Sequence, residues 1–217
     1  MLVKPETCEG CSLYASGKGY CPDKIAPHAR YVFWAEAPGR NEIIQHEPFV
    51  GKAGYVLKNW LMHAVLLFKV AFERGEITFA NTLRCLPPEI QGRAYPRGED
   101  RRLAEQHCRQ YDPSLDGVET IVLFGEAPQR VWFDEELRLE DATDKRLGHD
   151  LKGVSGRIGR EYLKGGKRWI LAPHPAYILR QPALVAHGQA ALKIAANQER
   201  VVDVEYVPWE AGMEALA

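Results

Sequence analysis

The sequence lacks any long hydrophobic run. Its longest apolar stretch, around residues 61–71, is interrupted by His63 and Lys69, whereas a membrane-spanning helix needs ~18 consecutive apolar residues or more. No basic region followed by an apolar one stands at the N-terminus, so we expect no secretory signal and a cytoplasmic location. With 46% hydrophobic and 26% charged residues, the composition is that of an ordinary globular protein.

An excess of charge of either sign is also missing. The chain has 28 Lys and Arg against 29 Asp and Glu, a net charge of −1, which gives no global argument for binding a polyanion. A nucleic-acid enzyme needs only local positive charge. Two local clusters exist, and each could equally be a solvated face: Arg93, Arg97, Arg101 and Arg102, and then Arg157, Arg160, Lys164, Lys167 and Arg168.

Cysteine is scarce, and the five cysteines are an odd number. Disulfides are rare in a reducing compartment, so metal binding or catalysis is the better interpretation. Cys8 and Cys11 form a Cys-x-x-Cys pair, and Cys85 and Cys108 could complete four ligands of a zinc ion or a four-iron four-sulfur cluster. Alternatively, the two distant cysteines are small buried apolar residues, and Cys21 could substitute in the set.

Apolar runs that alternate with helical patterns predict the fold class. Strand-like runs occupy residues 31–35, 77–81, 120–124 and 168–172. Helical spacing predicts helices over residues 51–71 and 99–111, from about 127, and over 182–197. Because strands separated by helices favour a parallel sheet covered on both faces, we expect a three-layer α/β/α fold with a central four-stranded parallel sheet.

We treat residues 1–217 as a single domain, with an irregular arm at residues 1–30 and a tail at 200–217. Three polar residues, Glu36, Asn81 and His174, come at or directly after the ends of predicted strands. Ligands of open α/β sheets bind at the carboxyl edge of the strands. These side chains are therefore expected to meet at one edge of the sheet.

Three sequence motifs and the cysteines carry a resemblance to a known family. The motifs are Glu36-Ala37-Pro38-Gly39 with Pro48 to Gly54, Asn81 to Cys85, and His174 to Arg180. With Cys8, Cys11, Cys85 and Cys108 in the matching order, the chain resembles the family-four, iron–sulfur type of uracil-DNA glycosylases over roughly residues 8–195. The departures are Ala35 in place of the usual Gly, a longer Cys85–Cys108 stretch, and a poorly matching segment 134–166.

The resemblance implies a DNA-repair hydrolase of the base excision pathway. Such an enzyme acts as a monomer on single- or double-stranded DNA, flips uracil out of the stack and hydrolyses its N-glycosidic bond. It implies a 4Fe-4S cluster, held by the four matching cysteines, with a structural role. It also implies that His174 donates a hydrogen bond to uracil O2 and that Glu36 positions the attacking water.

Further site residues follow from the same resemblance. Phe49 is expected to stack on the base, Asn81 to read its edge, and Ala37 to offer a backbone N–H. Glu42 corresponds to a position that excludes the methyl group of thymine. The residues expected to press into the DNA are Ile178, Leu179 and Arg180.

Each of these side chains also has an ordinary structural interpretation. Phe49 could be a core residue, Asn81 a strand-end turn residue, and residues 178–180 an apolar staple onto the next helix. Two other functions stay open on the sequence alone. One is a non-catalytic or altered-specificity member of the same superfamily that binds damaged bases, and the other is a zinc-bound nucleic-acid-binding module.

Overall fold

The computed structural model describes residues 3–90, 93–94, 96–133 and 161–196. Within these ranges, none of the helices combines the length and the apolar character that crossing a bilayer requires. The predicted tail at 200–217 and most of segment 134–166 lie outside the described residues.

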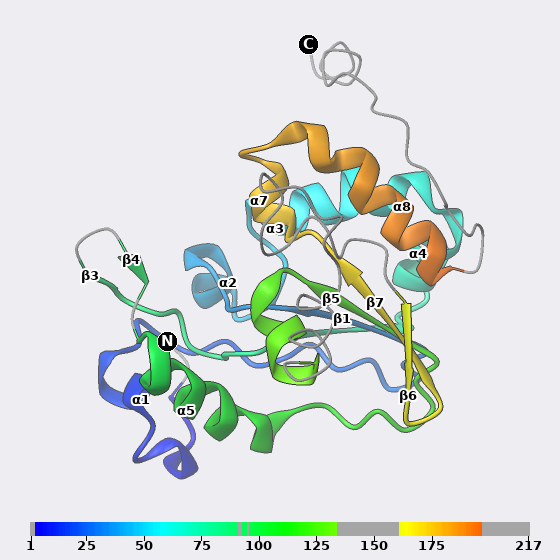
Figure 1. The fold of residues 1–217 in the computed structure, drawn as a ribbon. Coiled ribbons are helices and arrows are strands. Elements are labelled where there is room, and N and C mark those ends of the chain that lie inside the picture. Colours follow the sequence, from blue (N-terminus) through cyan, green and yellow to red (C-terminus); the bar gives the residue numbers. More distant parts are fainter. Residues whose placement is uncertain (1–2, 91–92, 95, 134–160, 197–217) are drawn as a thin grey trace, which may run out of the picture.

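A five-stranded sheet in the order β2-β1-β5-β7-β6 forms the centre of the fold (Figure 1). Four of its strands are parallel and confirm the predicted ranges to within one residue: β1 (Tyr31–Ala35), β2 (Ile77–Asn81), β5 (Thr120–Phe124) and β7 (Lys167–Ala172). The fifth, β6 (Glu161–Lys164), pairs antiparallel with β7. The expected count of four strands was therefore wrong, because this mostly exposed edge strand has no continuous apolar run.

The strands are buried on both faces because their side chains alternate between two cores. From β1, Tyr31, Phe33 and Ala35 enter one apolar cluster, and Val32 and Trp34 enter the other. Strands covered on both sides read as continuous apolar runs, which is why the sequence revealed them.

The first face of the sheet is covered by the segments between β1 and β2 and by the C-terminal helices (Figure 1). These are α3 (Lys52–Tyr55), η2 (Val56–Leu61), η3 (Met62–Ala64), α4 (Leu66–Glu73), α7 (Pro175–Ile178), η7 (Pro182–Leu184) and α8 (Val185–Ala195). The single helix expected over residues 51–71 is thus divided: η2 is π-helical, and Val65 takes an extended conformation that separates η3 from α4. The apolar side chains of the stretch still face one core.

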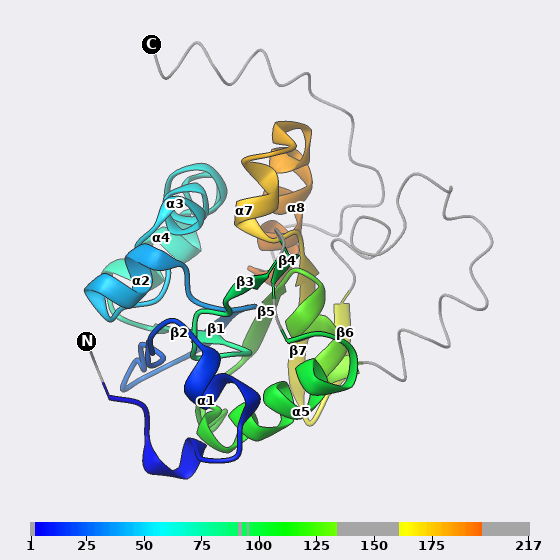
Figure 2. The ribbon, with the colours of Figure 1, turned by 90° about the vertical axis from the view of Figure 1, so that its left-hand side faces the viewer.

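On the opposite side lie the arm and the predicted charged helix, as Figures 1 and 2 both show. The elements there are η1 (Glu6–Cys8), α1 (Ser12–Ser16), α5 (Gly98–Cys108) and η4 (Arg109–Tyr111). Residues 126–133 are also helical and contribute Phe133 to the second core. A short hairpin, β3 (Glu89–Ile90) and β4 (Arg93–Ala94), and helix α2 (Arg40–Gln45) complete the described fold.

Arg84 joins the arm, the loop after β2 and the end of α5 through a buried ion-pair network. Its guanidinium, only 1% exposed, contacts Asp23 at 2.6 Å and Asp112 at 3.0 Å, and it also donates to the carbonyls of Cys108 and Tyr111. A buried charge is tolerated only when it is paired and hydrogen-bonded in this way.

We predict that Arg84→Leu lowers the free energy of unfolding by about 3–5 kcal/mol, because it leaves two largely buried carboxylates without their cation. Urea unfolding followed by circular dichroism measures the change. The matched control is Arg30→Leu, which breaks an exposed pair with Glu119 and is expected to cost about 1 kcal/mol or less. Equal losses in the two variants would contradict the structural importance of Arg84.

Candidate active site

A pocket of about 430 Å³ opens at the edge of the sheet where β1, β2 and β7 end. Five of the residues expected to act on a base line it together: Ala37, Glu42, Phe49, Asn81 and His174. They come from the segment after β1, from the end of β2 and from the turn after β7. The predicted meeting of strand-end residues at one edge is thus confirmed for Asn81 and His174, whereas Glu36 does not line the pocket.

Asn81 is the last residue of β2 and stands opposite Ala35 in the sheet. Its backbone N–H donates to Asp23 Oδ1 at 3.0 Å, which ties the strand end to the arm. The side chain is 3% exposed and lines the pocket. An amide carries both hydrogen-bond donors and an acceptor.

Phe49 is both a core residue and a pocket wall. Its ring is tilted against Phe79 at a centroid distance of 5.4 Å and meets the edge of Phe124 at 6.2 Å. The backbone at Phe49 has a φ of 57°, which is unusual for a bulky residue. Gly54 makes this turn possible, because a Cβ at that position would lie 1.8 Å from the carbonyl oxygen of Phe49.

His174 precedes α7 and caps it. The ring Nδ1 accepts a hydrogen bond from the backbone N–H of Ala176 at 3.1 Å. In the neutral ring, the single proton is therefore on Nε2. Gly125, with a φ of 85°, allows the close packing here, since a Cβ there would lie 2.9 Å from the Cβ of His174.

The environment of His174 favours the neutral ring. Burial is the largest influence and lowers the pKa of His174 below its ordinary value of about 6.5. The nearby charges of Glu36 and Glu42 oppose this lowering, and that of Arg180 adds to it. The result is a neutral imidazole with one N–H donor at the wall of the pocket.

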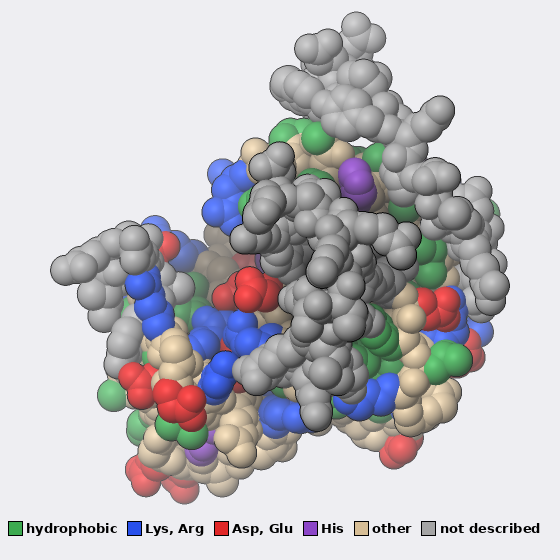
Figure 3. Space-filling model, in the orientation of Figure 1, with side chains coloured by type: hydrophobic (Ala, Val, Ile, Leu, Met, Phe, Trp, Pro, Cys, Tyr) green, Lys and Arg blue, Asp and Glu red, His purple; other side chains and the backbone are tan. Residues whose placement is uncertain are grey.

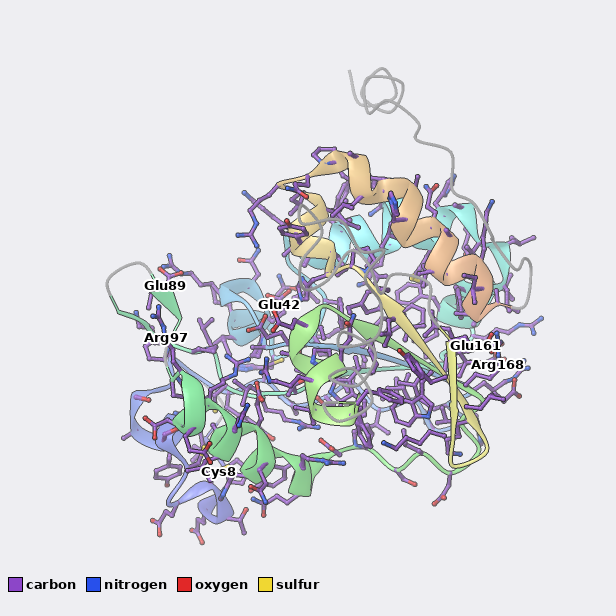
Figure 4. The ribbon with its side chains drawn as sticks, in the orientation of Figure 1. Cys8, Glu42, Glu89, Arg97, Glu161 and Arg168 are labelled. Carbon is purple, nitrogen blue, oxygen red and sulfur yellow. The ribbon has the colours of Figure 1, made fainter. Side chains whose placement is uncertain are left out.

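Glu42 belongs to the first turn of α2 and is one of its buried residues (Figure 4). Its carboxylate is buried in the pocket wall, and Oε1 accepts from the backbone N–H of Gly51 at 2.8 Å. Gly39 and Gly51 leave the space that it occupies, because a Cβ at either would come within 2.8 Å of a carboxylate oxygen. These glycines of the first motif therefore shape the pocket around Glu42.

Glu36 does not line the pocket, although its chain neighbours Ala35 and Ala37 do. Its side chain is 48% exposed, and Oε1 accepts from Arg101 Nη2 at 3.0 Å. The carboxylate is close enough to His174 to raise the pKa of that ring. Glu36 thus stands beside the pocket and close to His174.

The sequence interpretation missed two cations, Arg40 and Lys52, that line the pocket and are exposed. Each directly follows a glycine of the first motif, Gly39 and Gly51 respectively. Their place in the pocket is visible only in the structure, because neither belongs to a cluster of charges in the sequence.

The turn after His174 separates the three residues expected to contact DNA. Leu179 is 39% exposed, and Arg180 is exposed with its guanidinium 5.6 Å from the centre of the Tyr177 ring. Ile178 is instead fully buried and packs near Gly188 of α8. The expectation that Ile178 contacts DNA is therefore corrected, since this side chain is the apolar staple that anchors the turn.

Four of the five cysteines lie where the arm meets α5. Cys11, Cys85 and Cys108 belong to one apolar cluster, and Cys8, labelled in Figure 4, has its Sγ 3.3 Å from the hydroxyl of Tyr111. Burial and the neighbouring thiols Cys108, Cys8 and Cys11 raise the pKa of Cys85 to about 12, with burial the largest cause.

Cys21 is buried but does not belong to this apolar cluster. Its backbone N–H donates to the carbonyl of Arg84 at 2.8 Å. Burial raises the pKa of Cys21 to about 12, and the carboxylates of Glu42, Asp23 and Glu47 add to this effect.

No three His, Cys, Asp or Glu side chains converge in the described ranges as ligands of a single metal ion would. Each thiolate of a four-iron cluster binds a different iron, so the sulfurs stand farther apart than around one zinc ion. Four thiolates are a donor set that suits either a zinc ion or a four-iron cluster.

Comparison with known proteins identifies the family of this chain. Residues 22–199 match the uracil DNA glycosylase superfamily. A type-4 uracil-DNA glycosylase of Archaeoglobus fulgidus is 30% identical over 180 residues, 82% of this chain and 81% of that protein. The type-4 enzyme of Sulfurisphaera tokodaii is 33% identical (82% and 74% covered), and that of Pyrobaculum aerophilum 27% identical (88% of each). The chain belongs to the uracil DNA glycosylase superfamily.

Proposed function

We propose that this chain is a DNA-repair glycosylase that hydrolyses the N-glycosidic bond of uracil flipped out of DNA. The observation that carries the proposal is the single pocket that Phe49, Asn81 and His174 line together. The names of the similar proteins, type-4 uracil-DNA glycosylases, support the same activity.

His174 is assigned the role of stabilising the departing base. As the C–N bond breaks, the uracil gains negative charge and the sugar gains positive charge. A neutral imidazole whose Nε2 carries the proton donates a hydrogen bond to uracil O2 as charge builds there. Donors placed in advance for such a developing oxyanion contribute several kcal/mol in a site from which water is excluded.

Asn81 and Phe49 are assigned the recognition of the base. An amide offers a donor and an acceptor, which match O4 and N3–H of uracil, whereas cytosine presents the reverse pattern. The Phe49 ring supplies a stacking surface worth about 1–3 kcal/mol to a base. The backbone N–H of Ala37 adds a donor, and the buried Glu42 occupies the space that the methyl group of thymine needs.

Glu36 is assigned two roles: it positions the attacking water, and its negative charge offsets the cationic sugar. Its carboxylate is exposed beside the pocket and close to His174. A water held there is near the sugar cation, which is a strong electrophile. Glu36 therefore needs to remove little of the proton of the water early in the reaction.

The exposed surface next to the pocket is assigned to DNA. Leu179 and Arg180 fill the gap that the flipped base leaves, while the buried Ile178 holds their turn in place. Arg40 and Lys52 are placed to contact phosphates beside the flipped nucleotide. Arginine and lysine side chains are also visible in Figure 3 on the face that carries α5.

The four grouped cysteines, Cys8, Cys11, Cys85 and Cys108, are assigned to a 4Fe-4S cluster. Such a cluster supplies four covalent links between the arm, the loop after β2 and α5. Hydrolysis needs no electron transfer, so the role that we propose for these cysteines is structural.

We predict that His174→Ala and Asn81→Ala each reduce uracil release by about 100-fold or more, since each removes a group that acts in the transition state. The assay follows a labelled oligonucleotide that contains one uracil. His63→Ala and Asn59→Ala are matched controls, because both residues are exposed and outside the pocket. Near-normal release by both pocket variants would disprove the site, and binding without any release by the unmodified chain would favour a non-catalytic damaged-base binder.

The lowered pKa of His174 generates a prediction for pH. Because burial favours the neutral ring, the protonated form accumulates only below the ordinary value of about 6.5. The single-turnover rate of uracil release is therefore expected to stay level from about pH 8 down to about pH 6.5 and to fall only below that. A rate that already halves between about pH 7.5 and pH 7 would contradict a neutral donor.

The cysteine assignment predicts that Cys85→Ser loses iron, sulfide and solubility together. Cys21→Ser is the matched control, because Cys21 is also buried but is not one of the four cysteines assigned to the cluster. Metal and sulfide analysis of both purified variants measures the difference, with about four iron atoms expected per chain in the control. A colourless chain that contains zinc would instead support the zinc-bound module.

A further inference from the structure

The carboxylate of Glu36 is held from another part of the fold. Arg101 of α5 donates from Nη2 to Glu36 Oε1 at 3.0 Å. The other oxygen, Oε2, bonds to no residue that the structure describes. One side of the carboxylate is thus fixed by the protein, and the other side is left for solvent.

Arg101 is itself fixed by a buried anion. Its Nε donates to Glu105 Oε1 at 2.6 Å, one helical turn farther along α5, and Glu105 is 2% exposed. The same oxygen accepts from Arg130 at 2.7 Å, and Arg130 also pairs with Glu126 at 3.6 Å. Arg101 is 9% exposed, so it is not one of the mobile cations of a solvated helix face.

The planar guanidinium suits this double contact. Nη2 carries a second N–H that is directed away from Nε, so one rigid guanidinium can bind two carboxylates at the same time. Lysine has one nitrogen on a flexible chain and cannot hold both with the same geometry. The buried Glu105 therefore sets where Nη2 lies, and Nη2 sets where the Glu36 carboxylate lies.

We propose that Arg101 is a positioning residue for catalysis: it holds the Glu36 carboxylate beside the pocket so that the free oxygen orients the attacking water. This inference rests on the proposed function and on the role assigned there to Glu36. A half-exposed glutamate without a partner would distribute itself over several rotamers. Because Arg101 fixes one rotamer in advance, the conformational entropy of the Glu36 side chain does not have to be lost at the reacting step.

The test compares Arg101→Gln with the unmodified chain in steady-state uracil release. The expected result is a kcat about tenfold lower at an unchanged KM, because orientation is lost and base recognition is not. Arg102→Gln is the matched control: it is the next residue of α5, exposed, and its ion pair is a surface one with Glu99 at 3.9 Å. The control is expected to leave kcat and KM unchanged.

A second experiment tests whether Arg101 acts through Glu36. In a Glu36→Gln background, Arg101→Gln is expected to cause no further loss of kcat, because the carboxylate that it positions is already gone. Arg101→Lys keeps a positive charge next to Glu105 and is expected to fold with an intermediate kcat. It replaces Arg101→Gln in both backgrounds if thermal unfolding shows that the latter does not fold.

Two outcomes overturn the inference. If Arg101→Gln lowers kcat by the same factor with and without the Glu36 carboxylate, Arg101 does not act through Glu36. The same conclusion follows if Arg101→Gln only raises KM. If the unmodified chain releases no uracil, the proposed function fails and this inference fails with it. An active unmodified chain with additive losses overturns only the inference, so the two failures are distinguishable.

Discussion

The buried guanidinium of Arg84 is the interaction on which the site depends most. It pairs with Asp23 of the arm, and the other oxygen of Asp23 accepts the backbone N–H of Asn81. One ion pair therefore joins the end of β2, where the base is proposed to be read, to the arm that carries two of the grouped cysteines. Asp112 and the carbonyl of Cys108 extend the same network to the end of α5. Burial raises the pKa of Asp23 to about 6 against the opposing effect of Arg84.

Close packing at glycines also shapes the pocket, in addition to the ion pairs. Gly54 lets the chain approach the carbonyl of Phe49, and Gly39 and Gly51 make room for the Glu42 carboxylate. At each position a methyl group would come within 2.8 Å of another atom, closer than non-bonded atoms pack in protein interiors. The pocket is thus shaped by close backbone approach, and its rigidity costs no further side-chain entropy on binding.

The parts of the fold that the sequence predicted are those with a strong periodic signal. The four parallel strands are buried on both faces and read as apolar runs, and Asn81 and His174 meet because parallel strands end at one edge. Strand β6 was missed because its residues are mostly exposed. The break at Val65 was missed because its buried side chain fits the helical pattern although its backbone is extended. Ile178 was assigned to DNA because no sequence pattern distinguishes a buried staple from an exposed wedge.

Arg101 shows a second kind of feature that the sequence alone could not predict. In the sequence it is one of several arginines in a charged stretch, and nothing separates it from Arg102. In the structure the two neighbours differ completely, because the turn of α5 points one toward a buried carboxylate and the other toward solvent. The same helix carries Cys108 seven residues later, about two turns away. A helix held at one end by the grouped cysteines and Arg84 thereby presents a guanidinium of fixed position to Glu36. The segment that carries Cys108 is thus connected through α5 to the Glu36 carboxylate.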